Sequence, residues 1–402
     1  MSLRRHIVVG CRHAPCFNIR SLVLPASRFD GIVNGSAGRA DVYEGAPFAN
    51  MNAKLRGDLF AGIVRTSELI GEKDAHVTDA EPGMRCDGRR RAASTAEYDW
   101  LCNGRRVECK SAMLTWSGGA RRWSFRFQSV KFRSFDILLL VLYTPLELIV
   151  YQHDLSLGIS SSGARTETEG CQICFYGPGG VGDWRVALKS VLGRLDAPSN
   201  QCRQVARFSL QHASVVRALS NFRQTPYAVR MDEAYHDVPL ASLAGAVRGE
   251  RIQAIARLVD TILNMGSFVM DPVVGARSNG ARRSLRQAEY DWSRDGRRIE
   301  CKSSQLVWDP RKRVWSVTFR NIKPASFDDL VLCIYTPHGI FLYRHSGNFV
   351  LSSIGVRSER WARGYSVSVS GGRHKQDWSI ALDSVLKKVE QLSCEYVAFV
   401  EW

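Results

Sequence analysis

Two carboxylates and a lysine occur twice in this sequence at the same spacing. The sets are Asp99, Glu108 and Lys110 in the stretch EYDWLCNGRRVECKS, and Asp291, Glu300 and Lys302 in the stretch EYDWSRDGRRIECKS. Matching residues are 192 positions apart, the difference between 99 and 291. Oxygen ligands favour a hard ion such as Mg²⁺ or Mn²⁺. Each set therefore predicts a cation site with a lysine beside it, if the two carboxylates lie together.

A β-hairpin is the element that would bring them together. The dipeptides Asn103-Gly104 and Asp295-Gly296 each separate two runs rich in aromatic and aliphatic residues, which indicates a two-residue hairpin turn. Counting outwards from the turn places Asp291 directly opposite Glu300, with Cβ atoms about 5 Å apart. Strand alternation puts Lys302 on the same face and the apolar side chains on the other. Opposed carboxylates repel, so each hairpin either tolerates strain or binds a cation.

A plainer interpretation of the charged face remains open. Charged residues on an exposed hairpin are usually solvated, and Lys302 would lie opposite Glu289 as an ordinary cross-strand ion pair. The identical spacing of two copies favours a function, although duplication alone could preserve the motif without use.

The order of these residues resembles a known family. An Asp, then Glu-x-Lys across a hairpin, resembles the PD-(D/E)xK nuclease superfamily, and residues 249–305 are similar to archaeal-type Holliday-junction resolvases. Residues 57–112 carry the same resemblance. The resemblance implies two tandem restriction-endonuclease-like α/β domains. It also implies cleavage of phosphodiester bonds in nucleic acid, preferentially DNA, with Mg²⁺ or Mn²⁺ as cofactor.

The same resemblance assigns roles to the residues of each site. The metal ligands would be Asp99, Glu108, Asp291 and Glu300, the lysines that orient water and offset phosphate charge would be Lys110 and Lys302, and the helix-borne carboxylates would be Asp58 and Glu250. A glutamate in a first helical turn is also favourable through the helix dipole alone, so Glu250 has a structural explanation as well. Because Asp58 is shorter than Glu250, we expect the first site to be weaker than the second.

The distribution of charge favours a polyanionic partner. The chain carries a net charge of +16. The segment 81–135 has 12 Lys/Arg and 5 Asp/Glu, and the segment 275–325 has 13 and 5, so most of the excess surrounds the two hairpins. The expected nucleic-acid contacts are Arg89, Arg90, Arg91, Arg282, Arg283, Arg286, Arg311, Lys312 and Arg313. An acidic membrane is disfavoured because no basic amphipathic helix accompanies these segments.

The remaining pattern predicts a mixed sheet covered by helices in each copy. An amphipathic helix precedes each hairpin, and a second hairpin follows it. The near-continuous apolar runs FDILLLVLYTP and FDDLVLCIYTP indicate strands that are buried on both faces. Asp183 and Asp377 are expected to cap a closing helix. The fold class is therefore α/β.

The length of 402 residues and the repeat together predict two domains. We expect a basic arm or disordered tail at 1–50, domains at 51–195 and 243–393, a linker at 196–242 with one helix near 213–222, and a tail at 394–402. Eleven scattered cysteines favour a reducing, intracellular compartment over secretion. A monomer would then supply the two sites that a homodimeric nuclease builds from two chains.

Three functional hypotheses follow. The first is a Mg²⁺-dependent endonuclease acting on DNA, including branched or junction DNA. The second is a non-catalytic nucleic-acid-binding module derived from a nuclease fold. The third is a protein-interaction scaffold, which leaves the excess of Lys and Arg around the two hairpins unexplained. Whether the substrate is a junction, a duplex, a flap or RNA does not follow from the sequence.

Overall fold

The chain is described by a computed structural model. Its described residues are 6–9, 20–23, 26–33, 42–43, 45–49, 51, 53–66, 76–83, 88, 96–117, 120–131, 134–153, 171–197, 202–243, 245–275, 288–345, 365–373 and 375–402. Within these ranges, no helix combines the length and the hydropathy that a membrane span requires.

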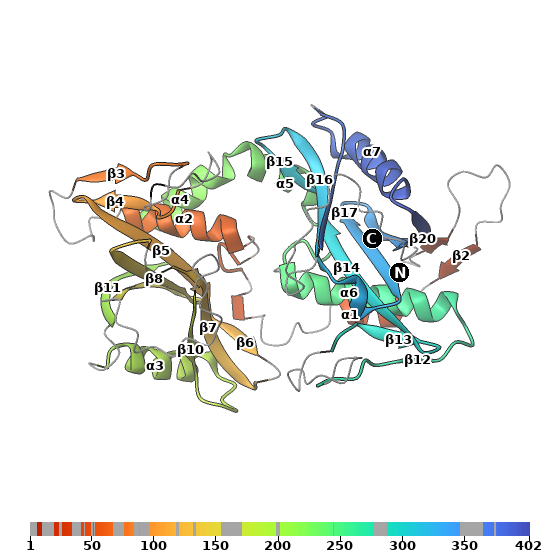
Figure 1. Cartoon of the computed structure of the whole chain (residues 1–402), viewed down its shortest axis with the longest axis horizontal. Helices are drawn as coiled ribbons and strands as arrows, with labels where there is room; N and C mark the ends of the chain where they lie inside the picture. The colour runs from red at the N-terminus through yellow and green to blue at the C-terminus, as the bar shows by residue number, and fades with distance from the viewer. Residues whose placement is uncertain are drawn as a thin grey trace. The chain divides into compact units, whose positions relative to one another are not determined.

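The protein divides into two compact units, each containing one copy of the repeat. The first domain is Ser36–Arg223, and the second domain is Gln224–Trp402 together with Met1–Gly35. Both have a mixed sheet flanked by helices, which confirms the predicted α/β class (Figure 1).

The first domain has a six-stranded sheet in the order β11-β9-β8-β5-β4-β3. Its strands are β3 Val77–Asp79, β4 Trp100–Cys102, β5 Arg105–Met113, β8 Ile137–Tyr143, β9 Glu147–His153 and β11 Cys202–Ser209. The neighbours β5 and β8 are parallel. A second, three-stranded sheet contains β6 Thr115–Ser117, β7 Arg122–Val130 and β10 Cys171–Tyr176. Helix α2 Ala53–Thr66 packs on β5, and helix α3 Trp184–Leu195 packs on the smaller sheet.

The second domain repeats this plan and extends it. Its main sheet has the order β12-β13-β14-β17-β18-β20-β1-β2. These strands are β12 Val269–Met270, β13 Trp292–Arg294, β14 Arg297–Gln305, β17 Asp329–Thr336, β18 Gly339–His345, β20 Cys394–Glu401, β1 His6–Val9 and β2 Arg20–Val23. The smaller sheet contains β15 Val307–Asp309, β16 Val314–Ile322 and β19 Tyr365–Ser370, and the 3₁₀ helix η3 Pro324–Ser326 follows β16. Helix α6 Gly245–Leu263 packs on β14, and α7 Trp378–Glu390 packs on β16 and β19.

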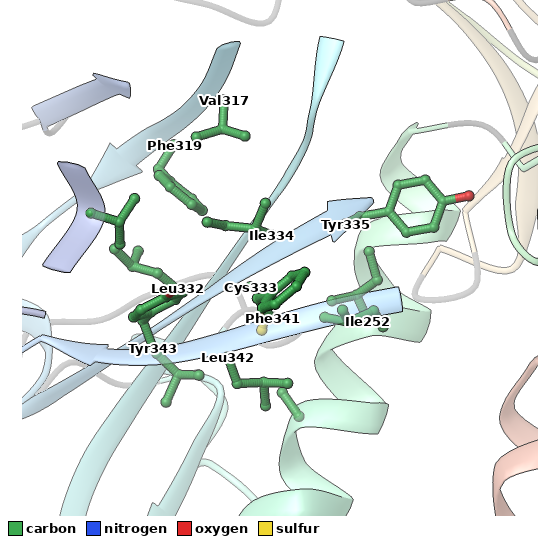
Figure 2. Close-up of a cluster of buried hydrophobic side chains, with 14 of the residues drawn as sticks. Ile252, Val317, Phe319, Leu332, Cys333, Ile334, Tyr335, Phe341, Leu342 and Tyr343 are labelled. Atoms are coloured by element: carbon green, nitrogen blue, oxygen red, sulfur yellow. The ribbon is translucent and has the colours of Figure 1, made fainter. Parts of the chain in front are cut away.

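The core of the second domain forms around β17, which carries a near-continuous apolar run. Because such a strand presents large side chains on both faces, layers must cover it on both sides. Ile252 of α6 and Phe319 of β16 come from distant parts of the sequence and belong to the same buried cluster as Ile334 (Figure 2). The expectation of a doubly buried central strand is confirmed in both domains.

Several local predictions are also confirmed. Trp116 pairs with Trp123 in the second hairpin of the first domain. The Asp183 side chain accepts a hydrogen bond from the Arg185 N–H at 2.8 Å and caps α3. The Asp377 side chain caps α7 in the same way.

The expected domain boundaries are wrong, because the packed structure extends beyond them. Within the expected N-terminal arm, 1–50, β1 pairs with β20 and helix α1 Ala26–Val33 packs on α6. Within the expected linker, 196–242, β11 pairs with β9, and helices α4 Ala213–Arg223 and α5 Pro226–Tyr235 pack on the first and second domains respectively. Most of the expected tail, 394–402, is the sheet strand β20.

Helices α1 and α4 occupy corresponding places in the two domains. α4 follows the first copy and packs on α2, whereas α1 precedes both copies and packs on α6, the counterpart of α2. The N-terminal segment therefore supplies the helix that packs on α6 in the second domain. Phe29 of α1 is buried, and its ring lies 6.3 Å from that of Trp402.

Candidate functional site

The hairpins have the predicted turn and register. Asp295 and Gly296 have φ values of 49° and 78°, as a type I′ turn requires. The strand partners Trp292↔Ile299 have the predicted register, and Asp291 directly precedes the first residue of β13. The first domain has the equivalent turn at Asn103-Gly104 and the equivalent register.

The aspartate of each hairpin is held against the opposite strand. The Asp291 N–H donates to the Ile299 carbonyl at 2.9 Å, and the Asp291 Oδ2 atom accepts the Cys301 N–H at 2.7 Å. Asp99 accepts the Cys109 N–H at the same distance of 2.7 Å. The Cys301 and Cys109 donors belong to the backbone. Each aspartate carboxylate is therefore held in a fixed position next to the start of β13 or β4.

The glutamate and lysine lie on one face, as strand alternation predicted. Lys302 forms an ion pair with Glu300, and these side chains are 23% and 12% exposed. Lys110 forms the same pair with Glu108. The ion pair of Lys302 therefore joins two residues of the same strand, Lys302 and Glu300 of β14.

The carboxyl groups are partly withdrawn from water. Burial raises the pKa of Asp291, against the opposing effects of the Cys301 N–H, the Lys302 ammonium and a hydrogen bond from Gln253. Burial likewise raises the pKa of Asp99 and of Glu108, and the charge of Asp99 raises that of Glu108 further. The two carboxylates of the first domain therefore repel each other, and a cation between them would relieve this repulsion.

The two helix-borne carboxylates lie near the hairpin aspartates but differ in their partners. Glu250 lines an open hollow of about 460 Å³ together with Gln253, Arg257 and Asp291. Asp58 forms an ion pair with Lys54 at 2.7 Å, and its charge contributes to the raised pKa of Asp99.

In each domain the helix carries a glycine where it faces the strand. A Cβ atom added at Gly249 would lie 3.4 Å from the Ser303 Oγ atom of β14, and one added at Gly57 would lie 3.4 Å from the Ser111 Oγ atom of β5. These are ordinary contact distances, so a Cβ atom at either position would just fit between the helix and the strand.

The carboxylate oxygens of each hairpin are the kind of ligand atom that a hard divalent cation prefers. Asp291 with Glu300, and Asp99 with Glu108, each offer two carboxylates on one hairpin. Within the described ranges, no group of three or more His, Cys, Asp or Glu side chains is arranged around a common point. A cation bound here would need water or phosphate oxygens to complete its coordination.

The predicted nucleic-acid contacts are only partly described. Arg311, Lys312 and Arg313 are exposed on the turn between β15 and β16. Asp309 shapes this turn by accepting the N–H groups of Arg311 and Lys312. The other six arginines, Arg89, Arg90, Arg91, Arg282, Arg283 and Arg286, lie outside the described residues.

Some arginines beside the hairpins have structural partners that the charge count missed. Arg298 forms a two-point ion pair with Asp328, with Nε and one terminal nitrogen at 3.1 and 2.8 Å from its oxygens. This pair lowers the pKa of Asp328 to about 2. Arg106 and Asp136 repeat the arrangement in the first domain. Both acids fall just beyond the counted segments, so the positive excess at each hairpin is smaller than the segments alone indicate.

Two features of the second site were not expected. Gln253 bonds to Asp291, and the first domain has Ala61 at the corresponding position. The buried Asp260 accepts a hydrogen bond from the Trp292 Nε1 atom at 3.0 Å and pairs with Arg294. The sequence held one usable signal for the second feature, since Asp260 directly follows the apolar residue Val259 in the helix that was predicted to be amphipathic.

Comparison with known proteins gives no relative: no family model, curated protein or solved structure matches this chain.

Proposed function

We propose that the protein is a Mg²⁺- or Mn²⁺-dependent endonuclease that hydrolyses phosphodiester bonds in DNA. The observation that carries the proposal is the duplicated hairpin, in which a backbone-anchored aspartate, a glutamate and a lysine have the same contacts in both domains. Partial burial of charged side chains is unfavourable. Because both copies nevertheless keep the three charged groups at one spacing, a function explains them more readily than chance does.

The residues of the second site have separate roles in this proposal. Asp291 and Glu300 would hold the cation, which supplies Lewis-acid polarisation of the phosphate. Lys302 would leave Glu300 and place its ammonium group beside the phosphate oxygens, where negative charge develops during attack by water. Attack forms a P–O bond to water and breaks the P–O bond to the leaving strand, the water releases a proton to solvent, and the leaving oxygen takes up a proton from solvent. Glu250 lines the hollow next to Asp291, where it can orient that water.

A non-catalytic nucleic-acid-binding module is the second candidate. The observation that favours it is the closed ion pair in both domains, together with the lack of a group of three acidic ligands among the described residues. In this alternative, the lysine neutralises the glutamate permanently, and the basic surface alone binds phosphate.

A cleavage assay separates the two candidates. The unmodified protein is incubated with fluorescent Holliday-junction, flap, duplex and single-stranded DNA, and with RNA of the same sequences, in Mg²⁺, in Mn²⁺ and in EDTA. The nuclease proposal expects products that require the cation. Binding to several substrates without any product, in either cation, would leave the binding module.

A further inference from the structure

An exposed aromatic ring is fixed at the hairpin turn of each domain. In the second domain it is Phe268, which precedes β12 and is 67% exposed. The Phe268 N–H donates to the Asp295 Oδ1 atom at 2.8 Å, and the Asp295 N–H donates to the Phe268 carbonyl at 3.0 Å. These bonds hold the backbone of Phe268 against the turn while its side chain stays in water.

The first domain has the same arrangement with a different ring. The His76 N–H donates to the Asn103 Oδ1 atom at 2.8 Å, and the Asn103 N–H donates to the His76 carbonyl at 2.9 Å. His76 is also exposed. A planar ring at this position is therefore a shared feature of the two hairpins.

Around Phe268, the second domain adds apolar side chains that the first domain lacks. Within ten residues of the sequence at and beside β12, the exposed apolar residues are Met265, Phe268, Met270, Val273 and Val274, with exposures between 44% and 85%. The corresponding residues of the first copy are Lys73, His76, Thr78, Glu81 and Pro82. Soluble proteins rarely keep large apolar side chains grouped in water unless the group binds something.

We propose that Phe268 and its apolar neighbours form a platform on which unpaired bases of the nucleic-acid substrate stack. This inference rests on the proposed action on nucleic acid and narrows the substrate to DNA with unpaired or unstacked bases, such as a fork or junction. Bases stack on exposed aromatic rings, and apolar side chains such as Met can wedge between base steps. The hairpin turn lies four residues from Asp291, about 13 Å along the strand. This distance spans roughly four stacked nucleotides.

The charge of the segment that follows the platform in the sequence favours nucleic acid over a protein partner. The segment 275–325 begins directly after Val274 and carries 13 Lys/Arg against 5 Asp/Glu. Ion pairs with Asp260, Asp328 and Asp329 neutralise part of this charge. The excess that remains, next to an apolar strip in the sequence, matches a ligand that joins flat apolar bases to a phosphate chain. A second copy of this chain would bring the same positive charge into contact with itself.

The test measures binding without cleavage. Fluorescence anisotropy in Ca²⁺ or EDTA is used with a forked DNA that has unpaired arms and with a fully paired duplex of equal length. The variants are Phe268→Ala, Phe268→Leu and Phe268→Trp. Ile380→Ala, which alters an exposed apolar residue of α7, is the matched control.

Stacking predicts a specific order of affinities. Phe268→Ala and Phe268→Leu should each weaken fork binding about tenfold, because stacking on one ring stabilises a base by roughly that factor or more. Phe268→Trp and Ile380→Ala should bind the fork as the unmodified protein does, and all variants should bind the duplex within about twofold.

Two outcomes would overturn the inference. In the first, Phe268→Leu binds the fork as tightly as the unmodified protein. In the second, sedimentation velocity shows that Phe268→Ala dissociates a dimer without changing fork affinity, so that the edge is a protein interface. Because no cleavage is measured, a fork-binding protein that never cuts would refute the nuclease proposal while leaving the platform supported.

Discussion

The Oδ2 atom of Asp291 lies 2.7 Å from the backbone nitrogen of Cys301, and Asp99 has the same relationship to Cys109. This bond ties each aspartate to the strand that carries the glutamate and the lysine. The geometry of the site therefore depends on the register of the hairpin, and any slip of the strands would separate the charged groups.

Neutralising Asp291 should not cost stability at neutral pH. Burial raises the pKa of this carboxyl in the folded protein, so the folded state holds a proton to higher pH than the unfolded state does. Its contribution to stability is then lost as the pH rises through the folded pKa, and at pH 7 the charge opposes folding. Asp291→Asn keeps an oxygen for the Cys301 N–H and removes that charge. Thermal denaturation at pH 7 should give an unchanged or higher midpoint, and a clear decrease would contradict this explanation.

Asp328→Asn is the control in which removing a carboxylate charge should lower the stability at pH 7. Arg298 lowers the pKa of Asp328 to about 2, so this carboxylate contributes stability above the unfolded value of about 4. That contribution is lost as the pH falls through about 2. The variant should be less stable than the unmodified protein at pH 7, and the difference should shrink towards pH 2.

Mg²⁺ should stabilise the fold through the two hairpins. A cation that binds only the folded state raises the unfolding midpoint by mass action. Because protons compete for carboxylates whose pKa is raised, the shift should decrease as the pH is lowered from 7 towards 5. Glu300→Gln should reduce the shift, and adding Glu108→Gln should remove it. An equal shift in the double variant would place the cation elsewhere.

The N-terminal helix should be required for the second domain. Phe29 is 1% exposed and contacts the core of that domain. Phe29→Ala should lower stability by about 3–5 kcal/mol, the usual loss for a buried phenylalanine. Calorimetry can resolve the domains as separate transitions, and only one should shift. Asp30→Ala, at an exposed neighbouring position, is the control. Shifts of equal size in the two variants would contradict the role of Phe29.

Nucleic-acid affinity should depend steeply on salt. Each phosphate contact adds about 0.9 to the slope of log affinity against log salt. Replacing Arg311, Lys312 and Arg313 by glutamine should weaken binding to all sequences alike and reduce the slope by about 2 to 3. Arg282→Gln with Arg283→Gln should act in the same direction. Lys387→Gln on the exposed face of α7 is the control, and an equal effect there would indicate only a net-charge effect.

The local geometry of the site was predictable because it depends on short-range rules. A type I′ dipeptide fixes the turn, and the two-residue period of a strand then fixes which side chains share a face. The pairing of Trp292 with Ile299, and the placement of Lys302 on the same face as Glu300, follow from counting. The Cys301 N–H bond to Asp291 was not predictable, since it depends on the exact position of a residue just outside the strand.

Features that depend on contacts between residues far apart in the sequence could not be predicted from it. No local pattern reveals that β1 pairs with β20, near the other end of the chain. The Tyr43 O–H donates to the Tyr143 carbonyl at 2.9 Å, and Tyr235 bonds to Tyr335 in the same way. These bonds extend the repeat into segments that had been assigned to an arm and a linker. They depend on contacts between residues a hundred positions apart, which no local pattern predicts.

The most direct test of the account is the single-turnover cleavage rate of lysine variants in Mg²⁺. Lys302→Ala should leave DNA affinity largely intact and lower the rate about a hundredfold or more, because the ammonium group acts mainly in the transition state. Lys110→Ala should lower it less, given the substitution of Asp58 for Glu250. Lys189→Ala and Lys387→Ala, which change exposed lysines of the closing helices α3 and α7, are the controls. These variants should cleave at the rate of the unmodified protein. Equal losses from Lys110→Ala and Lys302→Ala would instead indicate two equivalent sites, and a Lys302→Ala variant that cleaves at the full rate would contradict the proposed active site.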